Sequence, residues 1–327
     1  MVLSKMGLPK VSVIVPIYHS EPYLERCCRS LFSQTLDDIE CLFVIDGYSS
    51  SAETIIAEVL ADYPLRRDQI RILRHENNLG TSFSRQEGHD QAMGEFLYHC
   101  DSDDWLEPEA LETVYDKAKS EHADLVFFDY VRHYEDTSQE IVYRSAHVEQ
   151  GIISTMDGTL CNKLIRKQLL ASHNLRFPVG INWGEDLCMS VLLQLLASKI
   201  IYLPKVLYHY CLHKESFTTS IDEQKYLQLV SCPQYLEQEF AKRQLHDRYS
   251  SLLLQMKFEV KEYYLIHPSL RNIQKWLTIY PECHSAIWQY QSVPFYLKTV
   301  SWFAVNHLQW AAEFLLHCRA LIYSIRS

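Results

Sequence analysis

VSVIVPIY, residues 11–18, is a nearly uninterrupted run of β-branched and other apolar side chains. A strand that is buried on both faces needs such a run, so the segment predicts a central strand of a parallel sheet. The next residues, HSEPYL, place Ser20 as the expected cap of a helix, whose apolar side carries Leu24, Cys27, Cys28 and Leu31. A buried strand followed directly by an amphipathic helix indicates an α/β fold.

The same alternation continues through the first half of the chain. Further strands are predicted at 40–46, at 70–73, from Phe96, and at 125–131. Helices are predicted from a Ser50–Glu53 capping box to Tyr63, from Ser82 to Met93 and from Leu111 to Ser120. The pattern predicts a mostly parallel, Rossmann-like sheet with helices on both faces. Ligands of such sheets bind beyond the carboxyl ends of the strands, where we find Tyr18, Asp46 and Asp101.

Charge and glycine content divide the chain near residue 220. Residues 1–219 carry 20 Lys and Arg against 32 Asp and Glu, a net charge of −12, whereas residues 220–327 carry 11 against 9, a net charge of +2. The acidic part argues against nucleic acid as a partner, since such binding depends on basic surface. No glycine follows Gly184, which favours helices in the remainder of the chain. We therefore expect a domain at 1–220 and a helical region at 221–327.

Targeting and disulfide signals are missing from the sequence. No stretch of eighteen or more apolar residues occurs, and the N-terminus lacks the basic, apolar and small-residue pattern of a secretory signal. The ten cysteines include the adjacent Cys27 and Cys28 but no CxxC spacing, so neither a zinc site nor a disulfide framework is indicated. We expect a cytoplasmic protein with reduced, mostly buried cysteines.

A second informative stretch is FLYHCDSDDWL, residues 96–106, in which an apolar run ends in Asp101, Asp103 and Asp104. Carboxylates this close repel one another unless a cation lies among them. Oxygen ligands suit Mg²⁺ or Mn²⁺, whose remaining coordination positions are commonly filled by water and substrate phosphates. The stretch therefore predicts a metal-bridged diphosphate site. The alternative is an acidic turn that caps the helix opened by Pro108.

Four segments, taken in order, resemble glycosyltransferase family 2, whose members are inverting enzymes with the nucleotide-diphospho-sugar transferase (GT-A) fold. They are VSVIVPIYHSEPYL, ECLFVIDGYSS, NNLGTSFSRQEGHDQAMGEFLYHCDSDDWL and INWGEDLCMSVLLQ, and the resemblance extends over residues 9–220. It implies a UDP-sugar donor, Mn²⁺ or Mg²⁺ as cofactor, Asp103 as a metal ligand, and Asp101 as a ribose or metal contact. It also implies a nucleotide-sugar site that includes Pro16, Tyr18, Glu21, Asp46, Arg85 and Ser102.

Three positions depart from the family pattern. The family usually has an aspartate where this chain has Ile45, an asparagine where it has Gln86, and commonly an arginine where it has Cys211.

Two of the candidate binding residues have alternative roles. Asp46 can accept a hydrogen bond from the uracil imide N–H, or it can form an Asx turn after its strand. Arg85 can pair with phosphate or sugar hydroxyls, or it can lie solvated on its helix.

The segment GINWGEDLCMS, residues 180–190, places two carboxylates, Glu185 and Asp186, at the start of an apolar helix. The helix dipole stabilises carboxylates there, and helix capping is one interpretation. The resemblance implies that Asp186 is the general base that deprotonates the acceptor hydroxyl. It implies that Glu185 hydrogen-bonds the acceptor or orients its neighbour.

Further candidates lie within that segment and on either side of it. The resemblance implies that His213, as a third metal or phosphate contact, and Ser216 face the diphosphate. A histidine in a Tyr-rich run is otherwise a satisfied surface or core group. Trp183 is either a face for a sugar ring or a core residue. Lys163 is either a solvated helix residue or a contact to the acceptor or diphosphate.

Residues 221–327 are predicted to form helices rich in aromatic side chains, among them Trp276, Trp288, Phe295, Trp302, Phe303, Trp310 and Phe314. The last apolar run is interrupted by charged and His side chains, so it does not predict a membrane span. Three roles fit the composition: packing on the first domain, a homo-oligomer face, or contact with a membrane interface near a lipid-linked acceptor.

The resemblance thus implies transfer of a hexosyl or N-acetylhexosaminyl group from a UDP-sugar to an acceptor hydroxyl. The acceptor would be a glycan or lipid-linked intermediate of cell-surface polysaccharide synthesis, reached from the inner face of the cell membrane. A sugar nucleotidyltransferase is disfavoured because HSEPYLER, residues 19–26, contains no glycine to build a triphosphate loop. The same feature argues against a dinucleotide-dependent oxidoreductase. A non-catalytic sugar-nucleotide binder is the remaining alternative.

Overall fold

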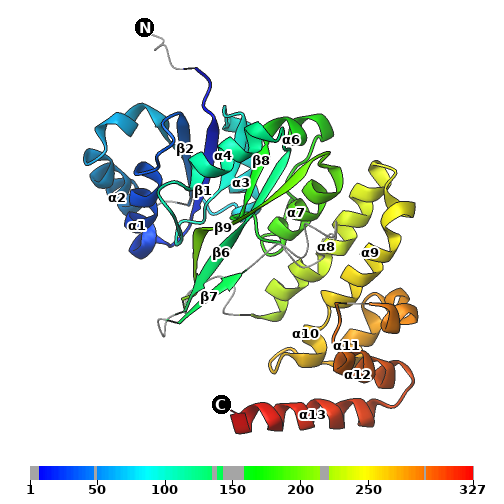
Figure 1. Cartoon of the computed structure of the whole chain (residues 1–327). Coiled ribbons are helices and arrows are strands. Elements are labelled where there is room, and N and C mark those ends of the chain that lie inside the picture. The colour runs from blue at the N-terminus through cyan, green and yellow to red at the C-terminus, as the bar shows by residue number, and fades with distance from the viewer. Residues whose placement is uncertain are drawn as a thin grey trace. The chain divides into compact units, whose positions relative to one another are not determined.

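The computed structural model describes residues 7–47, 50–134, 138–142, 158–213, 221–290 and 292–326 of the chain shown in Figure 1. The chain divides into two compact units, Met1–Ser220 and Ile221–Ser327. We call them unit 1 and unit 2. Each has its own buried core, so each is described by itself.

Within the described residues, unit 1 is built on a nine-stranded sheet. Its strands are β1 (Val11–Ile17), β2 (Ile39–Asp46), β3 (Ile70–His75), β4 (Phe96–His99), β5 (Trp105–Leu106), β6 (Leu125–His133), β7 (Gln139–Val142), β8 (Lys163–Arg166) and β9 (Ile200–Cys211). Their order is β3-β2-β1-β4-β8-β6-β9-β5, and β7 pairs with β6. β4 therefore lies between β1 and β8, and the strands that follow β4 in the chain extend the sheet on the side of β4 away from β1.

The predicted parallel arrangement holds for those four strands. β1 pairs in parallel with β2 and β4, and β2 pairs in parallel with β3. Beyond β4, β8 is antiparallel to both β4 and β6, whereas β6 and β9 are parallel, so the sheet as a whole is mixed. Neither β8 nor β9 is predicted from the sequence, because β8 has only four residues, two of them charged, and β9 contains Pro204 and Lys205.

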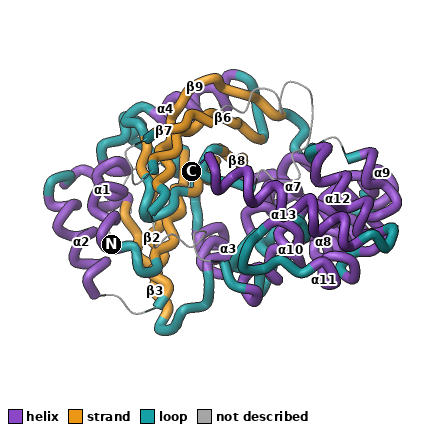
Figure 2. Tube along the Cα trace, turned by 90° about the horizontal axis from the view of Figure 1, so that it is seen from below, coloured by secondary structure: helices purple, strands orange, loops and turns teal. Residues whose placement is uncertain are grey.

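Helices cover both faces of the parallel strands, as predicted. α1 (Glu21–Phe32), α2 (Ser50–Ala61) and α4 (Ala110–Ser120) share one apolar core with alternate residues of β1. α3 (Thr81–Gln91) packs on the opposite face, so closely that a Cβ at Gly88 would lie 2.4 Å from Ile14 Cγ2. Figure 2 shows α1 and α2 on one side of β2 and β3 and α3 on the other. This two-sided burial is the reason that β1 and β2 are apolar on both faces. The other helices in the described part of unit 1 are η1 (Pro64–Gln69), α6 (Lys167–His173) and α7 (Glu185–Leu196).

The start of α1 corrects the predicted cap. Ser20 precedes α1, but its hydroxyl makes no capping bond and lies 2.6 Å from Ser102 Oγ instead. Ser20 thus connects α1 to the residues after β4. At α2, Glu53 pairs with Arg74 of β3, with an Nη2 to Oε2 distance of 2.7 Å, and the side chain of Ser50 lies outside the described residues.

Unit 2 is helical in the part that the structure describes. Its elements are α8 (Glu223–Lys242), α9 (His246–Glu259), α10 (Tyr263–Ile266), α11 (Ile273–Thr278), η2 (Pro281–Gln289), α12 (Phe295–Val305) and α13 (Gln309–Arg326). Large side chains fill its core, including fully buried Tyr226, Phe240, Phe258, Tyr264 and Trp276. No helix among the described residues is both long enough and apolar enough to cross a membrane.

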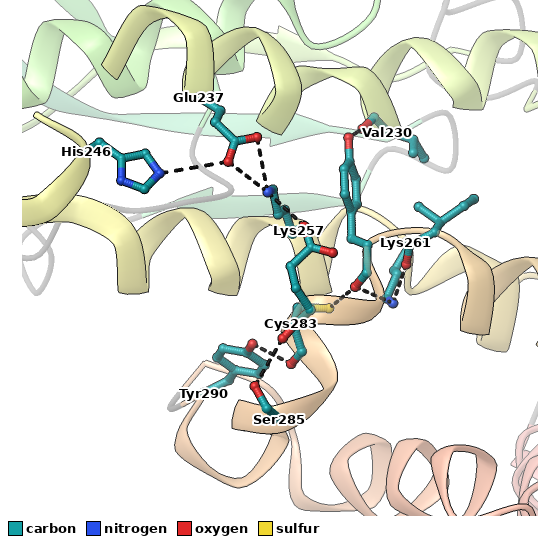
Figure 3. Close-up of polar contacts among 11 residues, drawn as sticks. Val230, Glu237, His246, Lys257, Lys261, Cys283, Ser285 and Tyr290 are labelled. Carbon is teal, nitrogen blue, oxygen red and sulfur yellow. Dashed lines mark hydrogen bonds and ion pairs between the residues drawn. The ribbon is translucent and has the colours of Figure 1, made fainter. Parts of the chain in front are cut away.

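Two buried lysines connect the helices of unit 2 (Figure 3). Lys257 Nζ lies 3.1 Å from Glu237 Oε1 and 2.8 Å from Glu282 Oε1. Lys261 Nζ donates to the carbonyls of Trp276 at 3.0 Å and Ile279 at 2.6 Å. Those carbonyls belong to the C-terminal end of α11, where backbone acceptors have no partner within the helix. Lys261 therefore supplies a hydrogen-bonded end to a short helix.

The aromatic side chains of unit 2 fall into two groups. Trp276 is fully buried, and the aliphatic residues of α12 and α13, such as Leu297, Val300 and Leu316, are buried as well. By contrast, five large aromatic side chains among those described in this unit are exposed, namely Trp288, Phe295, Trp302, Trp310 and Phe314. Packing within the unit therefore explains the aliphatic side chains but not these five.

Candidate active site

The carboxylate turn, residues 101–104, follows β4 at the carboxyl end of the parallel strands. Asp104 is its most buried carboxylate, with 1% exposure. Its oxygens accept hydrogen bonds from Cys211 N at 2.7 Å and from the Tyr208 hydroxyl at 2.5 Å. Burial and the neighbouring carboxylates raise its pKa, whereas the Tyr208 bond opposes that effect. Asp104 therefore attaches the turn to β9.

The other two carboxylates of the turn remain accessible. The side chain of Asp101 is 32% exposed and that of Asp103 is 27% exposed. Burial and Asp101 raise the pKa of Asp103, and a hydrogen bond with His213 opposes the rise. In that bond Asp103 Oδ2 lies 2.9 Å from His213 Nε2. The turn thus keeps surplus negative charge at an accessible position.

Arg85 on α3 connects the carboxylate turn to the start of α7. Its side chain is 7% exposed, with Nη2 2.8 Å from Asp101 Oδ1 and Nη1 3.1 Å from Glu185 Oε1. Burial lowers the pKa of Arg85, but Asp101, Glu185 and Asp186 outweigh burial and hold it above its ordinary value. The arginine is therefore not solvated. One buried cation gathers carboxylates from two sequence motifs into one site.

Glu185 and Asp186 open α7 directly after Gly184, whose φ of 98° is in the left-handed region. Burial, followed by the charge of Asp186, raises the pKa of Glu185 to about 8, and Arg85 opposes the rise. Burial also raises the pKa of Asp186, against the opposing effects of Arg85 and of the Leu187 N–H. That N–H donates to Asp186 Oδ1 at 2.7 Å. Raised carboxyl pKa values suit proton transfer near neutral pH.

The donor set fits a magnesium or manganese ion that is completed by a substrate. Among the described residues, no group of three or more His, Cys, Asp or Glu side chains is arranged to hold a metal by itself. Mg²⁺-type sites, however, commonly use one or two carboxylates together with substrate phosphates and water. Asp103 and Asp101 supply two such carboxylates with surplus negative charge. His213 lies next to Asp103 and can join them.

Asp46 binds the chain that leads into α3. Oδ1 accepts from Leu79 N and Oδ2 accepts from Gly80 N, both at 2.7 Å. His75 Nδ1 lies 2.8 Å from Oδ1, and the Asp46 side chain is 4% exposed. These bonds fix the position from which α3 starts, and so the position of Arg85. In this structure Asp46 therefore positions a loop, and the uracil contact stays a prediction.

The remaining nucleotide-sugar candidates lie at the ends of β1 and β4. Pro16 is half-buried in β1, and Tyr18 just beyond it is 54% exposed. Glu21 is the half-buried first residue of α1. Ser102 is 6% exposed and hydrogen-bonded to the Ser20 hydroxyl. The tight packing of Ser102 supports the shape of the turn.

The site residues come from segments that also characterise a family. Residues 12–174 match the model of Glycosyl transferase family 2. The chain belongs to glycosyltransferase family 2. EpsH of Bacillus subtilis is 33% identical over 223 residues, a match that covers 64% of this chain and 63% of EpsH. This family 2 chain therefore spans less than two thirds of the length of EpsH.

Two solved structures show the fold of this family 2 chain. S. aureus TarS 1–349, in complex with UDP-GlcNAc, matches with a TM-score of 0.70 at 19% identity, over 95% of this chain and 92% of that chain. The mannosyltransferase PcManGT from Pyrobaculum calidifontis, in complex with GDP-Man and Mn²⁺, matches with a TM-score of 0.54 at 16% identity, over 96% and 87%. At these identities the similarity shows the GT-A fold alone.

Some residues of the family 2 site have no signal in the sequence. The Tyr208 hydroxyl accepts from Asp101 N at 3.2 Å and donates to Asp104, and it is brought there by the pairing of β9 with β5 and β6. Lys163 is not a solvated helix residue: it is fully buried in β8, with Nζ 3.0 Å from Asn162 Oδ1. Ser216 lies outside the described residues. Trp183 is half-buried just before α7.

Proposed function

We propose that the protein transfers a sugar from a UDP-sugar to an acceptor hydroxyl with inversion at the anomeric carbon. The observation that carries the proposal is the position of Arg85, which lies 2.8 Å from Asp101 and 3.1 Å from Glu185. It joins a candidate diphosphate site to the Glu185–Asp186 pair, of which Asp186 is the candidate base. The complex of TarS with UDP-GlcNAc, a protein of the same fold, supports a UDP-linked donor.

Asp186 is the proposed general base. A carboxylate oxygen takes the proton of the acceptor hydroxyl while that hydroxyl oxygen forms a bond to the anomeric carbon. The bond from the anomeric carbon to the diphosphate oxygen breaks, and UDP leaves with the electron pair. Attack opposite the leaving group inverts the anomeric centre. The raised pKa of Asp186 supports this role because it brings proton affinity closer to neutral pH.

Asp103 and Asp101, with His213, would hold Mn²⁺ or Mg²⁺. When bound, the ion neutralises charge that develops on the departing diphosphate. Arg85 then has a second role as a fixed cation beside Asp101, since it holds the carboxylate turn against its own repulsion. The Mn²⁺ in the PcManGT complex supports a divalent cofactor in this fold.

The expected sugar is a hexose or N-acetylhexosamine, and the expected acceptor is a glycan or lipid-linked intermediate of cell-surface polysaccharide synthesis. The expected location is the cytoplasm, at the inner face of the membrane. The side chains exposed on α12 and α13 support that location: Phe295 is 76% exposed, Trp310 72% and Phe314 63%. Residues 294–326 contain Lys298, Arg319 and Arg326 against one acidic residue, Glu313. Aromatic and basic side chains together favour an anionic lipid surface.

Sedimentation with lipid vesicles tests the membrane contact. Vesicles that contain phosphatidylglycerol should bind the protein, neutral vesicles should bind it less, and a double variant, Trp310→Ser with Phe314→Ser, should bind neither. Light scattering on the same variant detects the competing role. A dimer that the double variant dissociates, without any vesicle binding by the wild type, would assign this face to a homo-oligomer instead.

A screen of UDP-sugars for release of UDP in the presence of Mn²⁺ tests the transfer activity without knowledge of the acceptor. Slow hydrolysis of one donor, which depends on Mn²⁺ and needs no acceptor, is the expected result. Binding of UDP-sugars without release of UDP under any condition would favour a non-catalytic binder. A requirement for a sugar phosphate and UTP would favour a nucleotidyltransferase.

A further inference from the structure

One face of α1 lies against the carboxylate turn and the strand that follows it. The Ser20 hydroxyl, just before α1, bonds to Ser102 at 2.6 Å. Further along the helix, Arg26 Nη2 donates to Asp103 O at 2.9 Å, and Ser30 Oγ accepts from Leu106 N at 3.3 Å. Arg26 and Ser30 are four positions apart, so they project from the same side of α1 toward this segment.

Arg26 makes the most extensive of these contacts. Its Nη2 lies 2.9 Å from Asp103 O and 3.0 Å from Cys211 Sγ, so it connects the turn to the end of β9. Its guanidinium carbon lies 3.9 Å from the centroid of the Trp105 ring, a cation–π arrangement. Trp105 also stacks on His209, with centroids 4.6 Å apart and an interplanar angle of 8°. The backbone after Asp103 is thus held by charge, hydrogen bond and stacking.

The Asp103 side chain is held through a second residue of the same helix. Tyr23 stacks on His213, with ring centroids 4.4 Å apart and planes 25° from parallel. His213 Nε2 in turn lies 2.9 Å from Asp103 Oδ2. Tyr23 and Arg26 are three positions apart, so they project from neighbouring places on α1. Together they hold Asp103 at its backbone and at its carboxylate.

We propose that Arg26 and Tyr23 are positioning residues that orient Asp103 for binding of a divalent cation with the diphosphate. The inference rests on the proposed function, because it concerns the metal ligand of that site. Mg²⁺-type ions require near-ideal octahedral geometry, so a ligand with a fixed orientation binds them better than a mobile one. Loss of outer contacts of this kind typically lowers metal affinity by about 10–100-fold.

The test compares three single variants of α1. Arg26→Met keeps the aliphatic part of the side chain but loses the hydrogen-bond donors and the charge. Arg26→Lys keeps the charge but loses the planar guanidinium that lies over the Trp105 ring. Arg29→Met is the matched control, since Arg29 lies on the same helix but pairs with Glu25 and Asp62. Free Mn²⁺ is titrated by electron paramagnetic resonance in the presence of UDP, and thermal unfolding is recorded for each variant.

Arg26→Met should weaken Mn²⁺ binding by about 10–100-fold. Arg26→Lys should weaken it less, and Arg29→Met should not change it. With the active enzyme, saturating Mn²⁺ should restore the kcat of Arg26→Met, because the residue does not touch the reacting atoms. Tyr23→Leu provides a second variant with the same criterion, should Arg26→Met fail to fold.

Wild-type Mn²⁺ affinity in folded Arg26→Met, or an equal loss in Arg29→Met, would overturn the inference. A loss of kcat that saturating Mn²⁺ does not restore would also contradict a positioning role. If the wild type with UDP binds no Mn²⁺, both this inference and the metal assignment fail. The UDP-release screen decides the transfer activity separately.

Discussion

Buried charges are arranged differently in the two units. In unit 1, one guanidinium, that of Arg85, faces three carboxylates from two segments of the chain, Asp101, Glu185 and Asp186. In unit 2, Lys257 has two carboxylate partners that remain partly exposed, and Lys261 is surrounded by backbone carbonyls. The first arrangement leaves surplus negative charge inside the protein, whereas the second gives each buried cation its own acceptors.

The difference distinguishes a candidate active site in unit 1 from buried charges that stabilise the helix packing of unit 2. Burial of an uncompensated charge is costly, so a fold retains one where a ligand compensates it or where its chemistry is used. Burial, followed by the charge of Asp186, raises the pKa of Glu185 to about 8, so this group takes up a proton near neutral pH. The lysines of unit 2 instead hold helices together, since their partners are the carboxylates of neighbouring helices and the end of α11. Four experiments test this distinction.

The largest effect is expected for Asp186→Asn, which keeps the shape of the side chain but cannot accept the proton. Transfer should fall by about 10²–10⁴-fold, the usual contribution of general-base catalysis, while UDP-sugar affinity stays near that of the wild type. Initial rates and calorimetric titration measure the two quantities. The control is Asp90→Asn, an exposed carboxylate paired with Arg176. Near-normal transfer, or loss of UDP binding instead of transfer, would remove Asp186 from the role of base.

The next effect is expected for Asp103→Ala. Turnover should fall by about 10²–10³-fold, because a bound cation contributes several kcal/mol to charge stabilisation. EDTA should abolish wild-type activity, and Mn²⁺ or Mg²⁺ should restore it. The variant should fold normally, since the change removes a carboxylate whose pKa is raised by burial and by Asp101. Asp116→Ala on the exposed side of α4 is the control. Full activity in Asp103→Ala would contradict the metal assignment.

Lys261→Met tests the supporting role of unit 2. The carbonyls of Trp276 and Ile279 lose their donor, so the free energy of unfolding should fall by about 1–3 kcal/mol. UDP affinity should not change. Denaturant unfolding and calorimetry measure both, with Lys275→Met as a control, because its exposed pair with Glu223 is worth less than about 1 kcal/mol. A loss of UDP binding in the folded variant would show that the two kinds of buried charge are not separate.

The smallest effect is a pH dependence of stability. Folding raises the pKa of Glu185 from 4.5 to about 8. The stability contributed by its protonated form is therefore fully present below pH 4.5 and is lost as pH rises through about 8. Glu185→Gln should flatten the fall in melting temperature across this range, because the amide does not titrate. Glu58→Gln, an exposed change on α2, is the control. An unchanged pH profile in Glu185→Gln would mean that the carboxylate surplus is not located there.

The sequence predicted the elements of the site better than their contacts. Apart from η1 and the two-residue β5, which were not predicted, the strand and helix order up to β6 follows from local apolar runs and their polar ends, as do the carboxylates after β4 and the Glu185–Asp186 pair. The cap role of Ser20 is wrong because its hydroxyl bonds to Ser102, which is distant in the sequence. The solvated helix position of Lys163 is wrong because the residue is buried in β8, where its ammonium group bonds to the adjacent Asn162 and lies 4.6 Å from the centroid of the Phe127 ring. A short strand such as β8 leaves too few residues for a clear alternation of apolar and polar side chains.

The sequence alone determined that the first domain is α/β and that carboxylates follow some of its strands at one edge of the sheet. Strands buried on both faces require apolar runs, and the polar residue after each run shows where the strand ends. The tertiary structure decided which carboxylate does what. Asp104 is tied to β9 across 107 positions, Asp103 lies next to His213 across 110, and Arg85 joins α3 to α7. Such roles depend on which strands pair and how closely the helices pack. The local sequence does not specify these contacts, because they join residues that are far apart in the chain.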